Sequence, residues 1–225
     1  MPVKERTRFE ADLNRFASMG GKIDSEHRCE DAEPVYAVDF QYLLMNRWAF
    51  DRLRGISGTL HDFASKVDFV AFAAADRDVI HYDIRKPDID IPGVLFKHGD
   101  LTALPLPDAS VSLASCLHVA EHVGLGRYGD EIDPHGFVKA CSELSRVLAP
   151  GGSLFFAVPV GVSRVVFNAH RVLSSGQVLT AFSGLRLAEF SGISKAGQYA
   201  EDVPVYSLDG DEYGCGLFHF VKDYK

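Results

Sequence analysis

From residue 58 onward, short runs rich in β-forming residues alternate with segments of helical periodicity. This alternation predicts a parallel sheet whose strands are joined by crossover helices. The expected strands cover residues 59–63, 78–83, 94–98, 111–117 and 153–158. Helices are expected over residues 67–75 and after the Asp133-Pro134 pair, where the acid would cap the helix and the proline suits its first turn. The Pro150-Gly-Gly run predicts the end of that second helix.

The pattern changes after residue 158. Residues 174–182 predict a short helix, and residues 185–193 and 216–222 predict two strands with no helix between them. Two closing strands without a crossover helix predict an antiparallel hairpin at one edge of the sheet. The sequence therefore predicts an α/β, Rossmann-like fold, in which a mostly parallel sheet ends in an antiparallel C-terminal hairpin.

The first 55 residues have a helical and irregular pattern. Phe9, Leu13 and Phe16 recur at helical spacing, residues 20–33 are typical of a polar loop, and residues 40–53 predict a second helix. We expect residues 1–55 to form a helical extension that packs on a core domain of residues 56–225.

The helix expected over residues 40–53 carries three aromatic side chains, Tyr42, Trp48 and Phe50. Burial in the core is the expected role of such residues. The alternative is an aromatic lid over a bound ligand.

Composition narrows the class of protein. Of the 225 residues, 47% are hydrophobic and 24% are charged, which is typical of a globular protein, and the net charge of -8 argues against nucleic acid as a partner. The four cysteines form no Cys-x-x-Cys pair, and the N-terminus has no signal-like segment, so we expect a cytoplasmic protein. The most apolar run, residues 154–167, is too short and interrupted to span a membrane, so no membrane partner is expected. The oligomeric state is left open.

Acidic residues follow the expected strands. Asp62 and Asp83 are 21 residues apart, and Asp100 follows the third expected strand. An open α/β sheet binds its ligand beyond the carboxyl ends of its strands, where an acid at this spacing grips ribose hydroxyls. The pattern therefore predicts an adenosine-type site, and the alternative is that these acids merely end strands in solvent.

Three runs carry a more specific resemblance. Residues 104–112 (LPLPDASVS), 118–122 (HVAEH) and 144–152 (LSRVLAPGG) resemble class I S-adenosylmethionine-dependent methyltransferases, whose sheet also ends in an antiparallel hairpin. The longer run over residues 118–130, with residues 168–171 (NAHR) and 213–217 (YGCGL), resembles a small branch of that superfamily whose members are largely of unassigned function. The resemblance covers the chain from about residue 40 to its end.

The resemblance implies S-adenosylmethionine as cofactor. Asp83 would hold the ribose, Asp100 and Leu101 the adenine, and residues 62–65 the methionine end. The complete cofactor-binding set expected is Asp62, Phe63, Ala64, Ser65, Asp83, Ile84, Asp100, Leu101, Leu117 and His118.

The implied reaction is methyl transfer to a small-molecule or sugar acceptor. His118 and His122 are the candidate catalytic residues, because imidazole can act as a base near neutral pH. Candidate substrate-binding residues are Glu121, Arg127, Tyr128, His170 and Arg171. The alternative for each is a structural role, as a polar residue that closes a strand or as part of a local ion pair.

The first loop departs from the superfamily's pattern. Residues 62–66 read DFASK, with Ala64 where the branch usually has a glycine that permits a positive φ. We expect the methyl group to be tolerated if φ is negative and to weaken cofactor binding otherwise. A Gly residue there should strengthen binding and lower stability. Ala64 is also the main support for an alternative function, a non-catalytic adenosyl-ligand-binding or scaffold protein.

Two literal motif matches compete with this interpretation. Residues 124–129 read G-x-G-x-x-G, but no strand leads directly into them and no helix opens at once, as a dinucleotide fingerprint requires. Residues 118–122 read H-x-x-E-H, as in a class of zinc proteases, but His118 ends an expected strand instead of lying on a helix. We expect no metal site, and a glycine loop over an active site is the favoured interpretation of residues 124–129.

Overall fold

The structure is a computed structural model that describes residues 10–11, 13–15, 17–19 and 38–224. The chain divides into two compact units, Met1–Val38 and Asp39–Lys225. The described positions 10–11, 13–15 and 17–18 are helical, whereas Phe9, Phe16 and the expected loop over residues 20–33 lie outside the described residues. The helix predicted over residues 40–53 belongs to the second unit.

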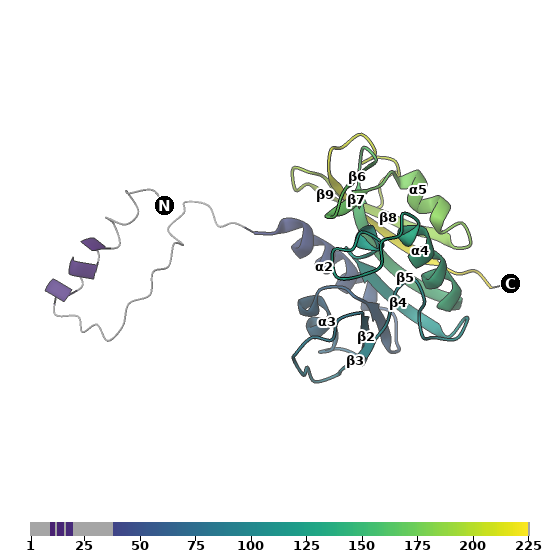
Figure 1. The fold of residues 1–225 in the computed structure, drawn as a ribbon, viewed down its shortest axis with the longest axis horizontal. Helices are drawn as coiled ribbons and strands as arrows, with labels where there is room; N and C mark the ends of the chain where they lie inside the picture. Colours follow the sequence, from purple (N-terminus) through teal and green to yellow (C-terminus); the bar gives the residue numbers. More distant parts are fainter. Residues whose placement is uncertain (1–9, 12, 16, 20–37, 225) are drawn as a thin grey trace. The chain divides into compact units, whose positions relative to one another are not determined.

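The second unit is built on one mixed sheet, with strand order β3-β2-β1-β4-β5-β10-β8-β9 (Figure 1). Five strands run parallel: β1 (Leu60–Phe63), β2 (Val79–Asp83), β3 (Val94–His98), β4 (Val111–Leu117) and β5 (Leu148–Val160). The antiparallel part consists of β10 (Gly214–Val221), β8 (Arg186–Ile193) and β9 (Tyr199–Ala200). The predicted fold class is confirmed, and β10 is inserted between β5 and β8.

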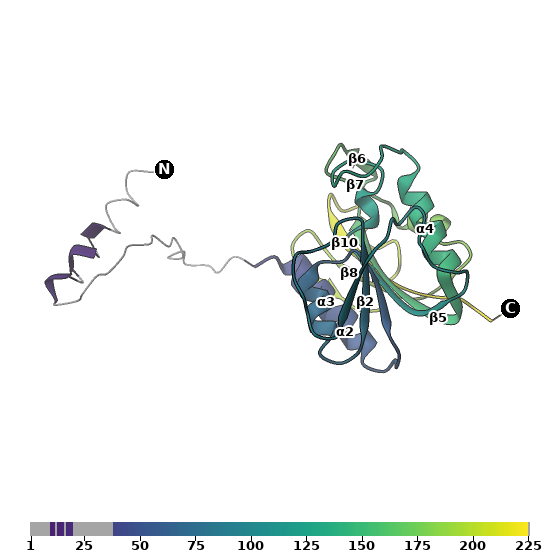
Figure 2. The ribbon, with the colours of Figure 1, turned by 60° about the horizontal axis from the view of Figure 1, so that its bottom comes forward.

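Helices cover both faces of the sheet, as Figure 2 shows. On one face lie α2 (Phe40–Leu53) and α3 (Val67–Ala73), and on the other lie α4 (Gly136–Val147) and α5 (Ser175–Ala181). The predicted boundaries of α2 are correct, and those of α3 and α5 are correct to within two residues. Ser174 caps α5 through a reciprocal pair of bonds with Gln177, which is a strong start signal.

Two predicted boundaries were wrong near α4. The carboxylate of Asp133 accepts the backbone N–H of His135 at 2.9 Å, and it is His135 that precedes the first helical residue, Gly136. At the other end, the helix stops at Val147 and β5 begins at once, so the Pro150-Gly-Gly run lies inside the strand. The run fits there because Gly151 has a φ of +76° and the pairing of β4 with β5 shifts register beside it.

A short hairpin was not predicted at all. It consists of β6 (Arg164–Val166) and β7 (His170–Val172), which pair with each other outside the main sheet. The hairpin lies at one end of the sheet (Figure 1). Its strands have three residues each, too few for a periodicity signal.

The aromatic residues of α2 have separate roles. Trp48 is fully buried, packs edge-on against Phe155 of β5, and donates its indole N–H to Glu189 of β8. Phe50 packs on Phe69 of α3. Core packing is therefore the role of Trp48 and Phe50, and it fixes the position of Tyr42 one helix turn away from the buried Met45.

Two of the motifs that carry the sequence resemblance bind each other. Arg146 of α4 donates to the carbonyl of Leu106 at 2.8 Å and to the carboxylate of Asp108 at 2.7 Å. Glu143 accepts the backbone N–H of Leu104 at 2.7 Å. These contacts attach the loop before β4 to α4, so these residues of the motifs help to hold the fold together.

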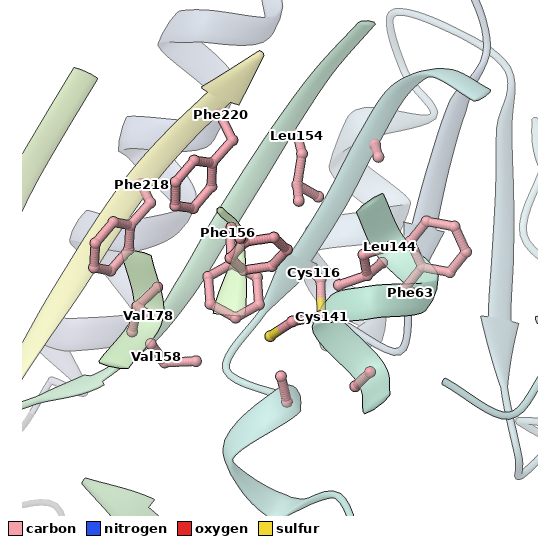
Figure 3. Close-up of a cluster of buried hydrophobic side chains, with 14 of the residues drawn as sticks. Phe63, Cys116, Cys141, Leu144, Leu154, Phe156, Val158, Val178, Phe218 and Phe220 are labelled. Carbon is pink, nitrogen blue, oxygen red and sulfur yellow. The ribbon is translucent and has the colours of Figure 1, made fainter. Parts of the chain in front are cut away.

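The core between the sheet and helices α4 and α5 is dense and aromatic (Figure 3). Phe156 of β5 lies at its centre, fully buried, with the ring of Phe182 edge-on at 4.8 Å and that of Phe218 at 6.4 Å. The free cysteines Cys116 and Cys141 are buried in the same cluster. Within the described part of the chain, no helix has the length and apolar character that a membrane span requires.

We predict that Phe156→Ala lowers the free energy of unfolding by about 3–5 kcal/mol, because a ring-sized cavity opens in a fully packed core. Phe72→Ala is the matched control, since Phe72 is 68% exposed and should change stability by less than about 0.5 kcal/mol. Urea unfolding monitored by circular dichroism measures both. Equal effects of the two substitutions would contradict the packing described here.

Candidate active site

A cavity of about 320 Å³ opens at the carboxyl ends of β1, β2 and β4. Nine of the residues predicted for the site line it: Ala64, Ser65, Asp83, Ile84, Asp100, Leu101, His118, His122 and Tyr128. The sheet thus brings together segments that lie more than 60 residues apart in sequence, from Ala64 to Tyr128.

Asp62 lies behind the cavity lining and organises the first loop. Its carboxylate is fully buried and accepts the backbone N–H of Ser65 at 3.1 Å, Nδ1 of His81 at 2.8 Å and the hydroxyl of Ser115 at 2.6 Å. Ser65 in turn accepts the backbone N–H of Leu117 at 3.0 Å. Asp62 and Leu117 therefore act on the shape of the loop, and neither lines the cavity.

Phe63 is also absent from the lining. It is fully buried in the core and stacks on Tyr82 of β2.

Ala64 has a φ of +59°, the left-handed conformation that the glycine of such a loop adopts without strain. A residue with a Cβ pays about 1–2 kcal/mol for this conformation. The loop therefore keeps the path that a glycine would give it, and the strain falls on Ala64, which lines the cavity.

Asp83 and Asp100, the acids predicted to contact ribose and adenine, are oriented by residues that follow them closely in the sequence. The backbone N–H of Arg85 donates to Oδ1 of Asp83 at 2.7 Å, and the Arg85 side chain approaches both carboxylate oxygens at 3.4 Å. Asp100 accepts the backbone N–H and the hydroxyl of Thr102, each at 2.8 Å. Both carboxylates are thereby oriented while they still line the cavity.

His118 and Glu121 form a buried pair at the inner end of the cavity. Nδ1 of His118 lies 2.8 Å from Oε1 of Glu121, and their side chains are 4% and 1% exposed. Burial lowers the pKa of His118, but Cys215 and Glu121 outweigh it and raise that pKa well above its ordinary value. Among the described residues, neither Nε2 of His118 nor Oε2 of Glu121 has a hydrogen-bond partner.

His118 also has a strained backbone, with a φ of +56°. Its imidazole is covered by the ring of Tyr42, whose centroid lies 5.2 Å away, and Nζ of Lys66 lies 3.2 Å from the Tyr42 centroid. Strain of this kind in a non-glycine residue is typical of functional sites.

His122 is held by contacts with the β6–β7 hairpin and with the loop that follows His122 in the sequence. Its Nδ1 lies 2.6 Å from the carbonyl oxygen of Ala169, at the turn of the β6–β7 hairpin. Arg127 donates to the same carbonyl at 3.0 Å, and the ring of Tyr128 packs edge-on against His122 at 5.5 Å.

Tyr128 lies between two guanidinium groups. Arg85 is 4.2 Å and Arg127 is 5.2 Å from its ring centroid. The side chain of Arg127 is exposed and is not part of the cavity lining. Cation–π contacts of this type fix the ring at the mouth of the cavity.

The remaining predicted substrate-binding residues lie outside the cavity. Arg171 is buried and donates to the backbone carbonyls of Val123 at 2.6 Å and Glu121 at 3.3 Å. His170 packs edge-on against Tyr213. Arg171 thus braces the segment that carries His122, because its guanidinium is committed to backbone oxygens.

Comparison with known proteins identifies the architecture. The [4+2]-cyclase SpnF shares 14% identity with this chain and superposes with a TM-score of 0.62 over 100% of this chain and 98% of that chain. The N-methyltransferase NodS from Bradyrhizobium japonicum, in complex with S-adenosyl-L-homocysteine, shares 16% identity with a TM-score of 0.57, over 87% and 94%. This chain has the class I methyltransferase fold.

Sequence comparison adds a shorter match. Residues 108–202 match a family described as "Caenorhabditis protein of unknown function, DUF268". Over 93 residues, 41% of this chain, the sequence is 37% identical to a Mycolicibacterium smegmatis protein described as a probable S-adenosylmethionine-dependent methyltransferase. That match spans 29% of the relative's length. The family match contains His118, Glu121 and His122 but not the first loop or Asp83.

Within the methyltransferase fold, the glycine-rich run over residues 124–129 is not a dinucleotide fingerprint. It follows the 3-10 helix η1 (Ala120–His122), and Asp130 holds it by accepting the backbone N–H groups of Gly124 at 2.8 Å, Gly126 at 3.2 Å and Tyr128 at 3.1 Å. Although burial raises the pKa of Asp130, these amides outweigh that effect and lower it.

The H-x-x-E-H run is likewise not arranged as it would be in a zinc protease. His118 is bound to Glu121 and His122 to Ala169, on a strand end and a single 3-10 turn instead of one helix face. No three His, Cys, Asp or Glu side chains in the described part of the chain are grouped so that they could hold a metal ion.

The cavity lining also contains residues that we did not predict from the sequence as part of the site. They include Tyr42, Lys66, Val67, Arg85, Gly99, Val119 and Val123. Asp130 was a further candidate from the sequence, and it lines the cavity as well. Lys66 and Arg85 directly follow Ser65 and Ile84 in the sequence. Their place in the lining could therefore have been predicted from those neighbours. Tyr42 comes from a distant helix, and the aromatic-lid alternative was the one hint of its role.

We predict that the His81–Asp62 bond stabilises the fold in a pH-dependent way. Burial lowers the pKa of His81, but Asp62 outweighs it and raises that pKa above its ordinary value. A raised folded-state pKa means that the stabilisation is complete below the unfolded value of about 6.5 and is lost as pH rises through the folded value. The stability difference between wild type and His81→Asn should therefore be largest near pH 6 and shrink toward about pH 9.

Urea unfolding across this pH range measures the difference, and His135→Asn, at an exposed histidine, is the matched control. A difference that stays constant with pH would show that His81 contributes packing alone.

Proposed function

We propose that this protein transfers a methyl group from S-adenosylmethionine to a small-molecule or sugar acceptor. The observation that carries the proposal is the cavity at the carboxyl ends of β1, β2 and β4, where Asp83 and Asp100 lie beside the first loop. In an open α/β sheet this is the position at which nucleoside ligands bind. The probable methyltransferase of M. smegmatis and the bound S-adenosyl-L-homocysteine of NodS support the same cofactor.

The residues present fit that cofactor. Asp83, held at one oxygen by the backbone of Arg85, can accept hydrogen bonds from the two ribose hydroxyls, and Asp100 can accept from the exocyclic amine of adenine. Ala64 and Ser65 line the end nearest His118, where the methionine part would lie. When bound, S-adenosylmethionine supplies an electrophilic methyl group, and the protein's own contribution is largely positioning.

Charge and shape favour a small acceptor. The chain has a net charge of -8, which opposes binding of a polyanion such as nucleic acid. The acceptor end of the cavity is lined by Tyr42, His122 and Tyr128, whose aromatic faces and polar atoms suit a hydroxyl-bearing small molecule or a sugar.

Calorimetry with S-adenosylmethionine and S-adenosylhomocysteine tests the cofactor, and formation of S-adenosylhomocysteine with a panel of sugars and small hydroxyl or amine compounds tests the reaction. Binding with turnover of a panel member supports the proposal. Absence of binding at millimolar ligand contradicts it, and binding with no turnover favours a non-catalytic adenosyl-binding protein. SpnF, a [4+2]-cyclase of the same fold, shows why both measurements are needed, because one fold hosts more than one activity.

We predict that Asp83→Ala weakens S-adenosylhomocysteine binding at least tenfold. Two charge-assisted hydrogen bonds are lost, each with a contribution of about 1.5–3 kcal/mol. Calorimetry measures the dissociation constant, and Asp88→Ala, an exposed acid outside the cavity lining, is the control. An unchanged constant in a folded Asp83→Ala protein would remove Asp83 from the ribose site.

We predict that Ala64→Gly strengthens cofactor binding and does not lower the melting temperature. Glycine removes a methyl group from the cavity lining and relieves about 1–2 kcal/mol of strain at a φ of +59°. This relief exceeds the entropic cost of about 0.4–1 kcal/mol that glycine adds in the unfolded state. The sequence-based expectation of lower stability is thereby reversed.

Differential scanning calorimetry and titration with S-adenosylhomocysteine measure both quantities. Ala75→Gly serves as a control at an exposed position outside the cavity lining, where no such strain is relieved. A lower melting temperature together with weaker binding would show that Ala64 is suited to its place in the loop.

A further inference from the structure

Two histidines line the cavity, and they differ in what their ring nitrogens can do. Nδ1 of His118 is bound to Glu121, and its Nε2 is enclosed by protein, with a side chain that is 4% exposed. Against the effect of burial, Cys215 and Glu121 raise the pKa of His118, which disfavours the loss of a proton from this ring. The enclosure of Nε2 by protein also keeps this atom from reaching a proton on a substrate.

His122 has the opposite arrangement. Its Nδ1 lies 2.6 Å from the carbonyl oxygen of Ala169, and a carbonyl oxygen can only accept a hydrogen bond. Nη1 of Arg127, which can only donate, also lies near Nδ1, but at the longer distance of 3.4 Å. The shorter contact with the carbonyl therefore places the proton on Nδ1, which leaves the lone pair of the neutral ring on Nε2. His122 lines the cavity, so this lone pair is available at the acceptor end.

Four other polar groups of the lining are less suited to accept a proton from the acceptor. The Asp130 carboxylate accepts three backbone N–H groups of its own loop. Burial raises the pKa of Tyr42, which makes its phenol a poor proton acceptor at neutral pH. Asp83 and Asp100 lie on the donor side. His122 is thus the lining group with a free basic atom at the acceptor end.

We propose that Nε2 of His122 is the proton acceptor of the methyl-transfer reaction, and that the acceptor is therefore a hydroxyl or amine compound that must lose a proton. This inference rests on the proposed function. From the sequence both histidines were candidate catalytic residues, and this inference selects His122 as the one that accepts the proton.

The methyl transfer moves one methyl group and one proton. A lone pair on the acceptor oxygen or nitrogen forms a bond to the methyl carbon, and the carbon–sulfur bond breaks with its electron pair left on sulfur. The proton of the acceptor's O–H or N–H group passes to Nε2 of His122.

Four charged or titratable groups face His122. Oε1 of Glu121 lies 3.6 Å from Nε2, so a proton that arrives there gains an electrostatic partner. Arg127, Tyr128 and His170 face the ring from the loop and the hairpin.

The first test is histidine-labelled ¹⁵N NMR of the full chain, which reports the tautomer of each ring. Near pH 8 we expect His122 with a protonated Nδ1 and an unprotonated Nε2, and His118 with both nitrogens protonated. The variants His122→Asn and His118→Asn assign the two sets of signals among the nine histidines. A protonated Nε2 on neutral His122, or a neutral His118, would overturn the inference.

The second test uses His122→Asn in the methyl-transfer assay, with whichever panel compound the wild type methylates. The Asn amide can donate to Ala169 in place of Nδ1 but offers no base at the Nε2 position. We expect turnover to fall about 10²–10⁴-fold, with the melting temperature and S-adenosylhomocysteine affinity retained. His98→Asn, at an exposed histidine outside the cavity, is the control.

The two proposals fail separately. A wild-type protein that does not bind S-adenosylhomocysteine contradicts the proposed function, whatever the tautomers are. If the wild type binds S-adenosylhomocysteine and the His122→Asn variant methylates the acceptor as fast as the wild type, only the assignment of His122 is contradicted.

Discussion

The buried carboxylate of Asp62 is the interaction on which the candidate site depends. It joins β1, in which it lies, to His81 of β2 and Ser115 of β4, and it also holds the backbone of Ser65 in the first loop. A fully buried carboxylate is costly unless donors satisfy it, and three donors do so here. Because these strands are adjacent in the sheet, one side chain fixes the relative position of the segments that form the donor side of the cavity.

The acceptor side is organised by different means. It consists of a 3-10 turn, a glycine-rich loop and a short hairpin, and side chains that bind backbone groups hold them together. Arg171 donates to carbonyls of the turn, Asp130 accepts amides of the loop, and His122 reaches the hairpin. Two of these three side chains, Asp130 and His122, also line the cavity, so the same residues fix the path of the loops and form part of the lining.

The junction of these two sides contains two of the five buried side-chain polar atoms that lack a hydrogen-bond partner among the described residues. His118 and Glu121 each have a buried polar atom with no hydrogen-bond partner among the described residues, and His118 and Ala64 both have a positive φ. Each of these features destabilises the fold to some extent. Their grouping around one cavity indicates a binding site more strongly than any single residue does.

The sequence by itself determined the sheet, its closing antiparallel strands and the acids at its carboxyl ends, because alternating periodicity and strand-terminal residues are local signals. It did not determine that Asp62 and Leu117 lie behind the lining, that Arg171 braces the backbone, or that Tyr42 reaches the cavity. Nor did it rank His118 against His122, since the two differ in burial and in the partner of Nδ1. Glu121 lies only three residues from His118, whereas Ala169 is brought to His122 by a tertiary contact. A hydrogen bond between residues 47 positions apart leaves no periodic trace in the sequence.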